Sequence, residues 1–221
     1  MMETARIHVR GTSKPVLSGL AACLLLTACG GGGGVEEQRV RAAQQCDDTL
    51  SPDAARALGT VLKRENFDHG PKGGLERSAG ELIADHDDRE RTTMHRPLCR
   101  VSVPGSLDRI DIDFGLYDID EPFGDVHPHG LHYYDMGREA QSGPKRAYLF
   151  VACVSPRLKG SDKNPARIRG ELNFTHSELP DTVAVREANL TVLHSVTLAV
   201  VKKLGCENNA GLTDKPVFKP G

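Results

Sequence analysis

Tryptophan is absent from this 221-residue sequence, and aromatic residues make up only 5% of it. This scarcity of rings argues against a surface platform of exposed aromatics for sugars. The chain has no long basic run and carries a formal net charge of −2. That balance is unlike the strongly basic surface of a nucleic-acid-binding protein, and it offers no polybasic segment for anionic lipid.

Catalytic signatures are also missing. The sequence has no G-x-S-x-G motif and no glycine-rich loop that links a strand to a helix in phosphate-binding style. Ser142 to Lys145 match S-x-x-K literally, but the intervening Gly-Pro forbids the helix on which that motif works, and no S-D-N or K-T-G follows. We therefore expect a protein that is not an enzyme, and a secreted hydrolase is the weakest of the hypotheses.

Residues 1–28 have the layout of a secretion signal. Basic residues at Arg6, Arg10 and Lys14 precede a short apolar run over residues 16–26. That run is shorter than the roughly 20 apolar residues of a membrane-spanning helix. The Leu-Thr-Ala-Cys stretch that ends at Cys29 resembles the bacterial lipobox. The resemblance implies that Cys29 receives a diacylglycerol and becomes the new N-terminus; the alternative is an ordinary secretory signal.

Residues 29–45 are expected to form a lipidated cysteine and a flexible tether. Five consecutive glycines, residues 30–34, act as a spacer, and coil up to residue 45 spans about 20–25 Å. Without the signal, the formal net charge falls to −4, because three basic residues and one acidic residue are lost. Two acyl chains give stable anchoring, so we expect a lipid-anchored protein on the extracellular face of the cell membrane.

Four cysteines remain after the signal and the lipid-bearing residue: Cys46, Cys99, Cys153 and Cys206. An even number in an exported chain predicts two disulfides, with three connectivities open. The absence of C-x-x-C pairs disfavours a structural zinc site or a thioredoxin-type site. Positions next to expected helices and strands favour Cys46–Cys99 and Cys153–Cys206.

Helical periodicity appears near both ends of the predicted domain, residues 46–208. Ser51 is suited to cap a helix that begins at Pro52, and a second apolar stripe predicts a helix over residues 75–86. A long helix is expected over residues 186–204 with its apolar residues on one side, ended by Gly205. Residues 209–221 are expected to form a C-terminal tail.

Strand periodicity occupies the middle of the chain. Residues 99–103 and 110–117 alternate between apolar and polar residues and flank a Pro-Gly-Ser turn, which predicts a hairpin. Residues 147–154 are apolar enough for a central strand, residues 167–174 alternate again, and residues 131–135 form a weaker candidate. The sequence therefore predicts an α+β domain with an antiparallel sheet of four or five strands, two N-terminal helices and one long C-terminal helix.

Three histidines in the stretch 118–135 are candidate metal ligands: His127, His129 and His132. Imidazoles bind Zn²⁺ or Cu²⁺, and three protein ligands plus water is a catalytic zinc arrangement. Pro128 excludes a regular central strand here, so the alternative is a solvated loop without a bound cofactor. An extracytoplasmic Zn- or Cu-binding protein is the second hypothesis for function.

Acidic residues suggest two weaker sites. Asp118 and Asp120 begin like a calcium loop, but Pro122 stands where the next ligand should be. Asp111 and Asp113 project from one strand face as paired carboxylates, although no partner for acid–base chemistry can be named and exposed strand positions are usually just polar. His86 and His194 lie within expected helices, where we expect packing or capping roles.

The mature chain resembles uncharacterised lipoproteins that high-GC actinobacteria export in many copies. The resemblance rests on Cys29 with its glycine tract and on the segments "CDDTLSPDAARALGTVL", "LCRVSV", "VACVSPRLKGS" and "LHSVTLAVVKKLGCENNAGL". The order of its elements is similar to that of proteins with a PsbP-like α+β shape. The resemblance implies an envelope location and two disulfides but no reaction. We therefore expect a non-enzymatic module that binds a small ligand or an envelope protein.

Overall fold

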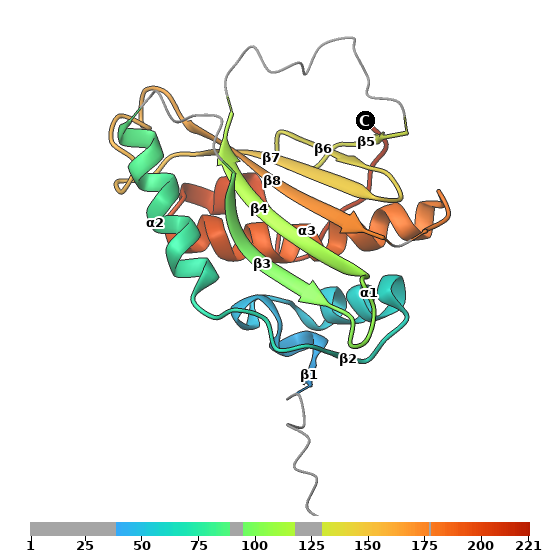
Figure 1. Cartoon of the computed structure of the whole chain (residues 1–221). Helices are drawn as coiled ribbons and strands as arrows, with labels where there is room; N and C mark the ends of the chain where they lie inside the picture. Colours follow the sequence, from blue (N-terminus) through green and yellow to red (C-terminus); the bar gives the residue numbers. More distant parts are fainter. Residues whose placement is uncertain (1–38, 89–94, 118–129, 177) are drawn as a thin grey trace, which may run out of the picture. The chain divides into compact units, whose positions relative to one another are not determined.

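The computed structural model describes residues 39–88, 95–117, 130–176 and 178–221. Helices cover one face of a six-stranded antiparallel sheet in this part of the chain (Figure 1). The α-helices are α1 (Pro52–Leu62), α2 (Gly74–Asp87) and α3 (Val183–Leu204). The strands of the sheet are β3 (Arg96–Ser102), β4 (Arg109–Leu116), β5 (His132–Tyr134), β6 (Glu139–Ser142), β7 (Arg146–Cys153) and β8 (Ala166–Thr175). Among the described helices, none has the length and apolar content that crossing a membrane requires.

The strand order is β3-β4-β8-β7-β6-β5. The predicted α+β class and the hairpin of β3 and β4 are confirmed, and β7 is an inner strand as expected. Alternate residues of β4 and β8, such as Ile112 and Leu172, are fully buried under the helices. Gly170 lets α3 approach the sheet closely, because a Cβ atom there would lie about 3.0 Å from Thr197 Oγ1.

The prediction of four or five strands was wrong, because the sheet contains six. The strand that the sequence did not reveal is β6, whose residues Glu-Ala-Gln-Ser include no β-branched or aromatic side chain. Its last three residues are nevertheless buried, since β6 lies between β7 and β5. Neighbouring strands thus impose the extended conformation on residues with weak strand propensity.

Helix α1 begins as the sequence indicated. The Ala54 N–H donates to Ser51 Oγ (3.2 Å), and Pro52 occupies the first turn, where its missing N–H costs no helical bond. Helix α2 is capped from a distant residue instead. The backbone N–H groups of Gly73 and Leu75 donate to the two carboxylate oxygens of Asp47, at 2.8 and 2.7 Å.

Helix α3 is buried on more than one side, so the expectation of a single apolar face was incomplete. It contacts β6, β7 and β8 and also packs against α1 and α2. Ser195, on the side facing α1, accepts from the Ser51 N–H (2.8 Å) and donates to the Thr49 carbonyl (2.9 Å). The helix begins three residues earlier than predicted, at Val183, and ends as expected at Gly205, whose φ is +71°.

Two disulfides connect Cys46 to Cys99 and Cys153 to Cys206, which is the favoured pairing. Each closes a loop with a sequence separation of 53 residues. The first ties the turn before α1 to β3, and the second ties β7 to the second residue after α3. Both bridges therefore join the helical layer to the sheet.

Ordered structure extends beyond the predicted domain limits at both ends. The two-residue strand β1 (Val40–Arg41) lies inside the stretch expected to be tether, and it pairs with β2 (Asn66–Phe67). At the other end, the Asp135 N–H donates to the Lys219 carbonyl (2.9 Å). The Phe218 ring packs edge-on against Tyr134, with centroids 6.1 Å apart. The C-terminal segment thus covers the edge of the sheet at β5.

Candidate functional site

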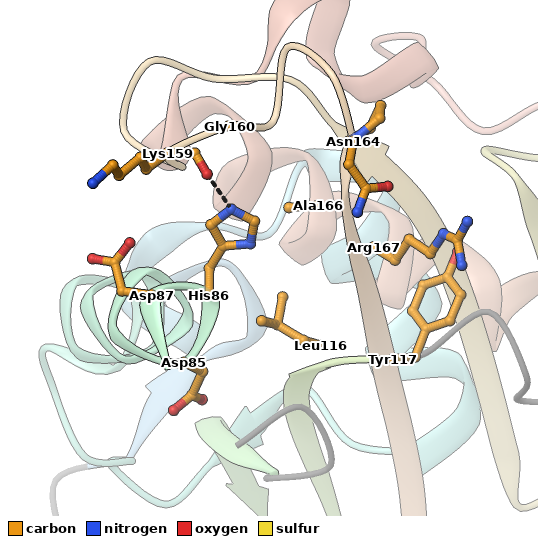
Figure 2. A pocket seen from close by; sticks show the side chains of 11 residues that line it. Asp85, His86, Asp87, Leu116, Tyr117, Lys159, Gly160, Asn164, Ala166 and Arg167 are labelled. Atoms are coloured by element: carbon orange, nitrogen blue, oxygen red, sulfur yellow. Dashed lines mark hydrogen bonds between the residues drawn. The ribbon is translucent and has the colours of Figure 1, made fainter. Parts of the chain in front are cut away.

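A cavity of about 570 Å³ opens beside the end of β4 (Figure 2). Its walls are the last turn of α2, the end of β4 with the residue that follows, and the segment 159–167, which leads into β8. The lining residues are Asp85, His86, Asp87, Leu116, Tyr117, Lys159, Gly160, Asn164, Pro165, Ala166 and Arg167. Sites for small molecules have volumes of about 300–1,000 Å³, so the cavity has room for one.

The α2 wall contains a buried carboxylate that is already neutralised. Asp85 is 1% exposed and accepts two hydrogen bonds from Arg96, at 2.6 Å from Nε and 2.5 Å from Nη2. The hydrogen bond to Asp85 raises the pKa of the Arg96 guanidinium, which stays charged and compensates the carboxylate that it contacts. Asp85 therefore fixes the end of α2 against β3 and adds little net charge to the cavity.

His86 connects the two sides of the cavity. Its Nε2 lies 3.1 Å from the Lys159 carbonyl oxygen, in hydrogen-bond contact (Figure 2). The sequence suggested only a packing or capping role for His86, and the structure places it in the cavity wall. This bond joins the last turn of α2 to the segment that follows β7.

The opposite wall belongs to the sheet. Leu116 and Ala166 are 5% and 4% exposed and form an apolar floor. The Tyr117 N–H donates to the Arg167 carbonyl (3.1 Å), which extends the pairing of β4 with β8 by one residue. Figure 2 shows the Arg167 side chain beside Tyr117, across the cavity from α2.

The segment between β7 and β8 is held in place by hydrogen bonds. The Ser155 N–H donates to Ser161 Oγ, and the Ser161 hydroxyl donates to the Ser155 carbonyl, both at 2.9 Å. Ser155 Oγ also donates to the Leu204 carbonyl at the end of α3 (2.5 Å), and Leu158 is 1% exposed. Because these contacts are buried, the cavity wall is formed before any ligand binds.

The sheet face away from the helices carries the predicted carboxylates. Asp111 accepts from Arg100 Nε (2.6 Å) and Arg109 Nε (2.9 Å), so it is a structural ion-pair residue. Asp113 faces Glu171 directly across the β4–β8 pair. Burial of the Asp113 carboxyl raises its pKa, and the negative charges of Asp111 and Glu171 raise it further. The two aspartates thus have different environments, because Asp111 is held in ion pairs with two arginines whereas Asp113 faces a carboxylate.

His95 lies over the same sheet face. Its Nδ1 is 3.6 Å from Glu171 Oε2, and its Nε2 is 3.3 Å from Arg169 Nη2. The sequence indicated nothing about this group, because His95, Asp113 and Glu171 come from three separate segments. These contacts join His95, Glu171 and Arg169 in one polar network, and Asp113 lies opposite Glu171 on the neighbouring strand.

Only His132 of the three predicted metal ligands lies in the described part of the chain. It is exposed on β5, and its Nε2 is 3.5 Å from Asp181 Oδ2. His127 and His129, like Asp118 and Asp120 of the suggested calcium loop, lie outside the described residues. Within the ranges that the structure describes, no group of three or more His, Cys, Asp or Glu side chains is arranged to hold a metal ion.

The literal S-x-x-K match is structural. Ser142 is buried in β6 and donates to the Arg186 carbonyl (3.0 Å), whereas Lys145 pairs with Glu178 (2.7 Å between Nζ and Oε1). His194 is also a core residue, at 2% exposure, as the sequence suggested. Burial lowers the pKa of its imidazole, partly offset by a hydrogen bond to the Thr213 backbone.

Comparison with protein-family models, with curated proteins and with solved structures gives no match.

Proposed function

We propose that the protein is an exported lipoprotein, anchored to the cell membrane through diacylglyceryl-Cys29, whose domain binds a small polar ligand in the cavity beside β4. The anchor rests on the sequence of the first 34 residues. The binding role rests on one observation, a cavity of about 570 Å³ with a hydrogen-bonded, rigid wall. In this proposal the protein acts on the extracellular face of the membrane, and no nucleic acid is among its partners.

The cavity is better suited to binding than to catalysis. No Ser, Thr or Cys side chain lines it among the described residues, so it offers no hydroxyl–histidine or thiol–histidine pair with His86. The charged side chains of Lys159 and Arg167 and the apolar floor of Leu116 and Ala166 are suited to holding and orienting a ligand. We therefore propose a binding protein that is not an enzyme, and a secreted hydrolase has no comparable support.

Native mass spectrometry of the protein isolated from its own envelope tests the binding role. We expect a non-covalent adduct of discrete mass on the wild type. Asn164 is exposed at the rim of the cavity, so Asn164→Trp should obstruct the cavity without disturbing the core and should remove the adduct. Lys163 is equally exposed on the same segment but does not line the cavity, so Lys163→Trp is the matched control. An adduct that Asn164→Trp leaves in place would contradict the proposal.

Detergent partition tests the anchor separately. We expect the wild-type protein to enter the detergent phase and Cys29→Ala to remain in the aqueous phase, because two acyl chains are what hold the protein at the membrane. Mass spectrometry should show a diacylglyceryl group on Cys29. An ordinary secreted protein with a free cysteine or a different cleavage site would contradict this part of the proposal.

The proposed fold relatives are proteins with a PsbP-like shape, and the proposed family is that of the actinobacterial exported lipoproteins. The support is the sequence segments around the four cysteines together with an antiparallel sheet covered by α3. An envelope protein that docks on the domain is the other form of the binding hypothesis. Cross-linking of the lipidated protein in its membrane distinguishes a protein partner from a small ligand.

A second candidate function is binding of Zn²⁺ or Cu²⁺ by His127, His129 and His132. The observation in its favour is the contact of His132 with Asp181, because histidines that bind metals commonly pair their other ring nitrogen with a carboxylate. Asp181 is in turn held by Arg186, whose hydrogen bond lowers the pKa of the Asp181 carboxyl. Zinc or copper titration of the mature protein should lose its saturable phase in His129→Ala and His132→Ala. Unchanged binding in both variants would remove the site.

A further inference from the structure

The charges around the cavity beside β4 do not cancel. Asp85 is neutralised by Arg96, which leaves Asp87, Lys159 and Arg167 as the charged groups among the described lining residues, with His86 counted as neutral. These described lining residues together carry one net positive charge, whereas the whole chain has a formal net charge of −2. A cavity of opposite sign to the rest of the molecule attracts anions locally.

Arg167 is the cation best placed for recognition. Among the residues that the structure describes, no carboxylate lies within ion-pair distance of its guanidinium. Its backbone is fixed in β8, opposite Ala152 of β7, and its carbonyl accepts from Tyr117. A guanidinium fork on a rigid strand matches the two oxygens of a carboxylate or phosphate.

The polarity of the opposite wall determines which way such a ligand lies. The last turn of α2 presents its backbone carbonyls and the exposed Asp87, and the C-terminus of a helix carries partial negative charge. This wall repels an anion, so the acidic group belongs at the Arg167 side. Asn164 and His86 can form hydrogen bonds with hydroxyl groups of the ligand, and Leu116 with Ala166 contacts its carbon skeleton.

We propose that the ligand of this cavity is a small hydroxylated acid whose carboxylate or phosphate binds Arg167. This inference rests on the proposed ligand-binding function and names the chemical class of the ligand. Arg167 is then the residue that determines specificity for the charge. The volume of about 570 Å³ accommodates a molecule the size of a sugar phosphate.

Three probes test the proposal on the mature protein made with Cys29→Ser: glucose 6-phosphate, glucose and inorganic phosphate. Glucose and glucose 6-phosphate have the same ring, so their difference reports the acidic group. Titration calorimetry should show glucose 6-phosphate binding at least tenfold more tightly than glucose, since charged hydrogen bonds contribute about 1.5–3 kcal/mol, or about 10- to 150-fold. Inorganic phosphate should bind more weakly than glucose 6-phosphate, because it lacks the hydroxyl contacts.

Arg167→Gln should abolish the preference for glucose 6-phosphate over glucose. Arg146→Gln is the matched control, because Arg146 is an exposed arginine on the same sheet face, near the other end of β7. Backbone NMR shifts should locate the sugar phosphate at residues 116–117 and 164–167, and Asn164→Trp should block it without altering the core. Equal binding of glucose and glucose 6-phosphate, equal effects of the two arginine variants, or NMR shifts elsewhere would overturn the assignment.

The outcomes also separate this inference from the function on which it rests. An envelope adduct that is lost in Asn164→Trp, together with no preference for the phosphate, would keep the binding function and refute an acidic ligand. The absence of any adduct on the wild-type protein, or an adduct that Asn164→Trp leaves in place, would refute the binding function itself.

Discussion

The two disulfides close loops of equal length, which allows a controlled measurement of what each contributes. For a sequence separation of 53 residues, the loss of chain entropy in the unfolded state corresponds to about 4 kcal/mol per bridge at 25 °C. We compare Cys46→Ala/Cys99→Ala with Cys153→Ala/Cys206→Ala. The entropic contribution predicts the same loss of unfolding free energy in both double variants.

Differences in the folded state should then separate the two variants. Cys153 is fully buried on the inner strand β7 and its partner Cys206 is 8% exposed, whereas Cys46 before α1 and Cys99 on the edge strand β3 are each 6% exposed. Truncating the Cys153 side chain leaves a void that its neighbours cannot fill, so we expect an additional loss of about 1 kcal/mol at the second bridge. Burial thus makes Cys153–Cys206 the more costly bridge to remove.

Urea unfolding followed by far-ultraviolet circular dichroism gives both values, and this probe is suitable because the chain has no tryptophan for fluorescence. The wild-type protein under oxidising conditions is the reference. Loss of less than about 1.5 kcal/mol in either double variant would refute the entropic reasoning for this chain. A larger loss at Cys46–Cys99 than at Cys153–Cys206 would refute the reasoning from burial.

Three further changes test single contacts. Asp113→Asn should stabilise the domain at pH 7 by about 0.2–1 kcal/mol, because it removes a like charge opposite Glu171. The raised pKa of Asp113 means that the ionised form is costly, so this gain should vanish in urea unfolding near pH 3, where the carboxyl is protonated in both states. His194 has a lowered pKa in the folded protein, so stability should fall as the pH drops below about 6.5, where the unfolded chain takes up a proton first. His194→Gln should flatten that slope between pH 7 and pH 5 in thermal unfolding, and an unchanged slope would contradict the assignment. Asp47→Ala should cost about 1 kcal/mol by removing the cap of α2, with a matching loss of protection from hydrogen exchange at Gly73 and Leu75; Asp48→Ala, an exposed neighbour, is the control.

Local chemistry made much of the fold predictable. Ser51 and Pro52 specify the start of α1 through a side-chain cap and a fixed φ angle, and Gly205 ends α3 because it adopts a positive φ. Each of these signals acts within a few residues, so it can be read without knowing what surrounds it. The alternating pattern of β4 is equally local, because one strand face is buried along its whole length.

Features that depend on distant segments could not be predicted in the same way. The cap of α2 comes from Asp47, which is 26 residues before Gly73, and β6 is a strand because β5 and β7 flank it. The cavity is lined by α2, β4 and the segment that leads into β8. Arg167 lies in β8, and the alternating pattern of that strand predicted only that its other face is buried. Arg167 and His86 have no sequence motif in common, so only the topology brings them together.

The N-terminal end of the described domain and the cavity lie at opposite ends of strand β4. The chain enters at Val40, where β1 pairs with β2, and the Asp68 N–H beyond β2 donates to the Ser102 carbonyl at the end of β3. Ser102 pairs with Arg109, the first residue of β4, whereas the cavity lies at the last residue, Leu116. Seven residue steps of about 3.3 Å separate these ends by about 23 Å. A ligand in the cavity therefore contacts a part of the domain remote from Val40, so contacts made near Val40 need not alter the walls of the cavity.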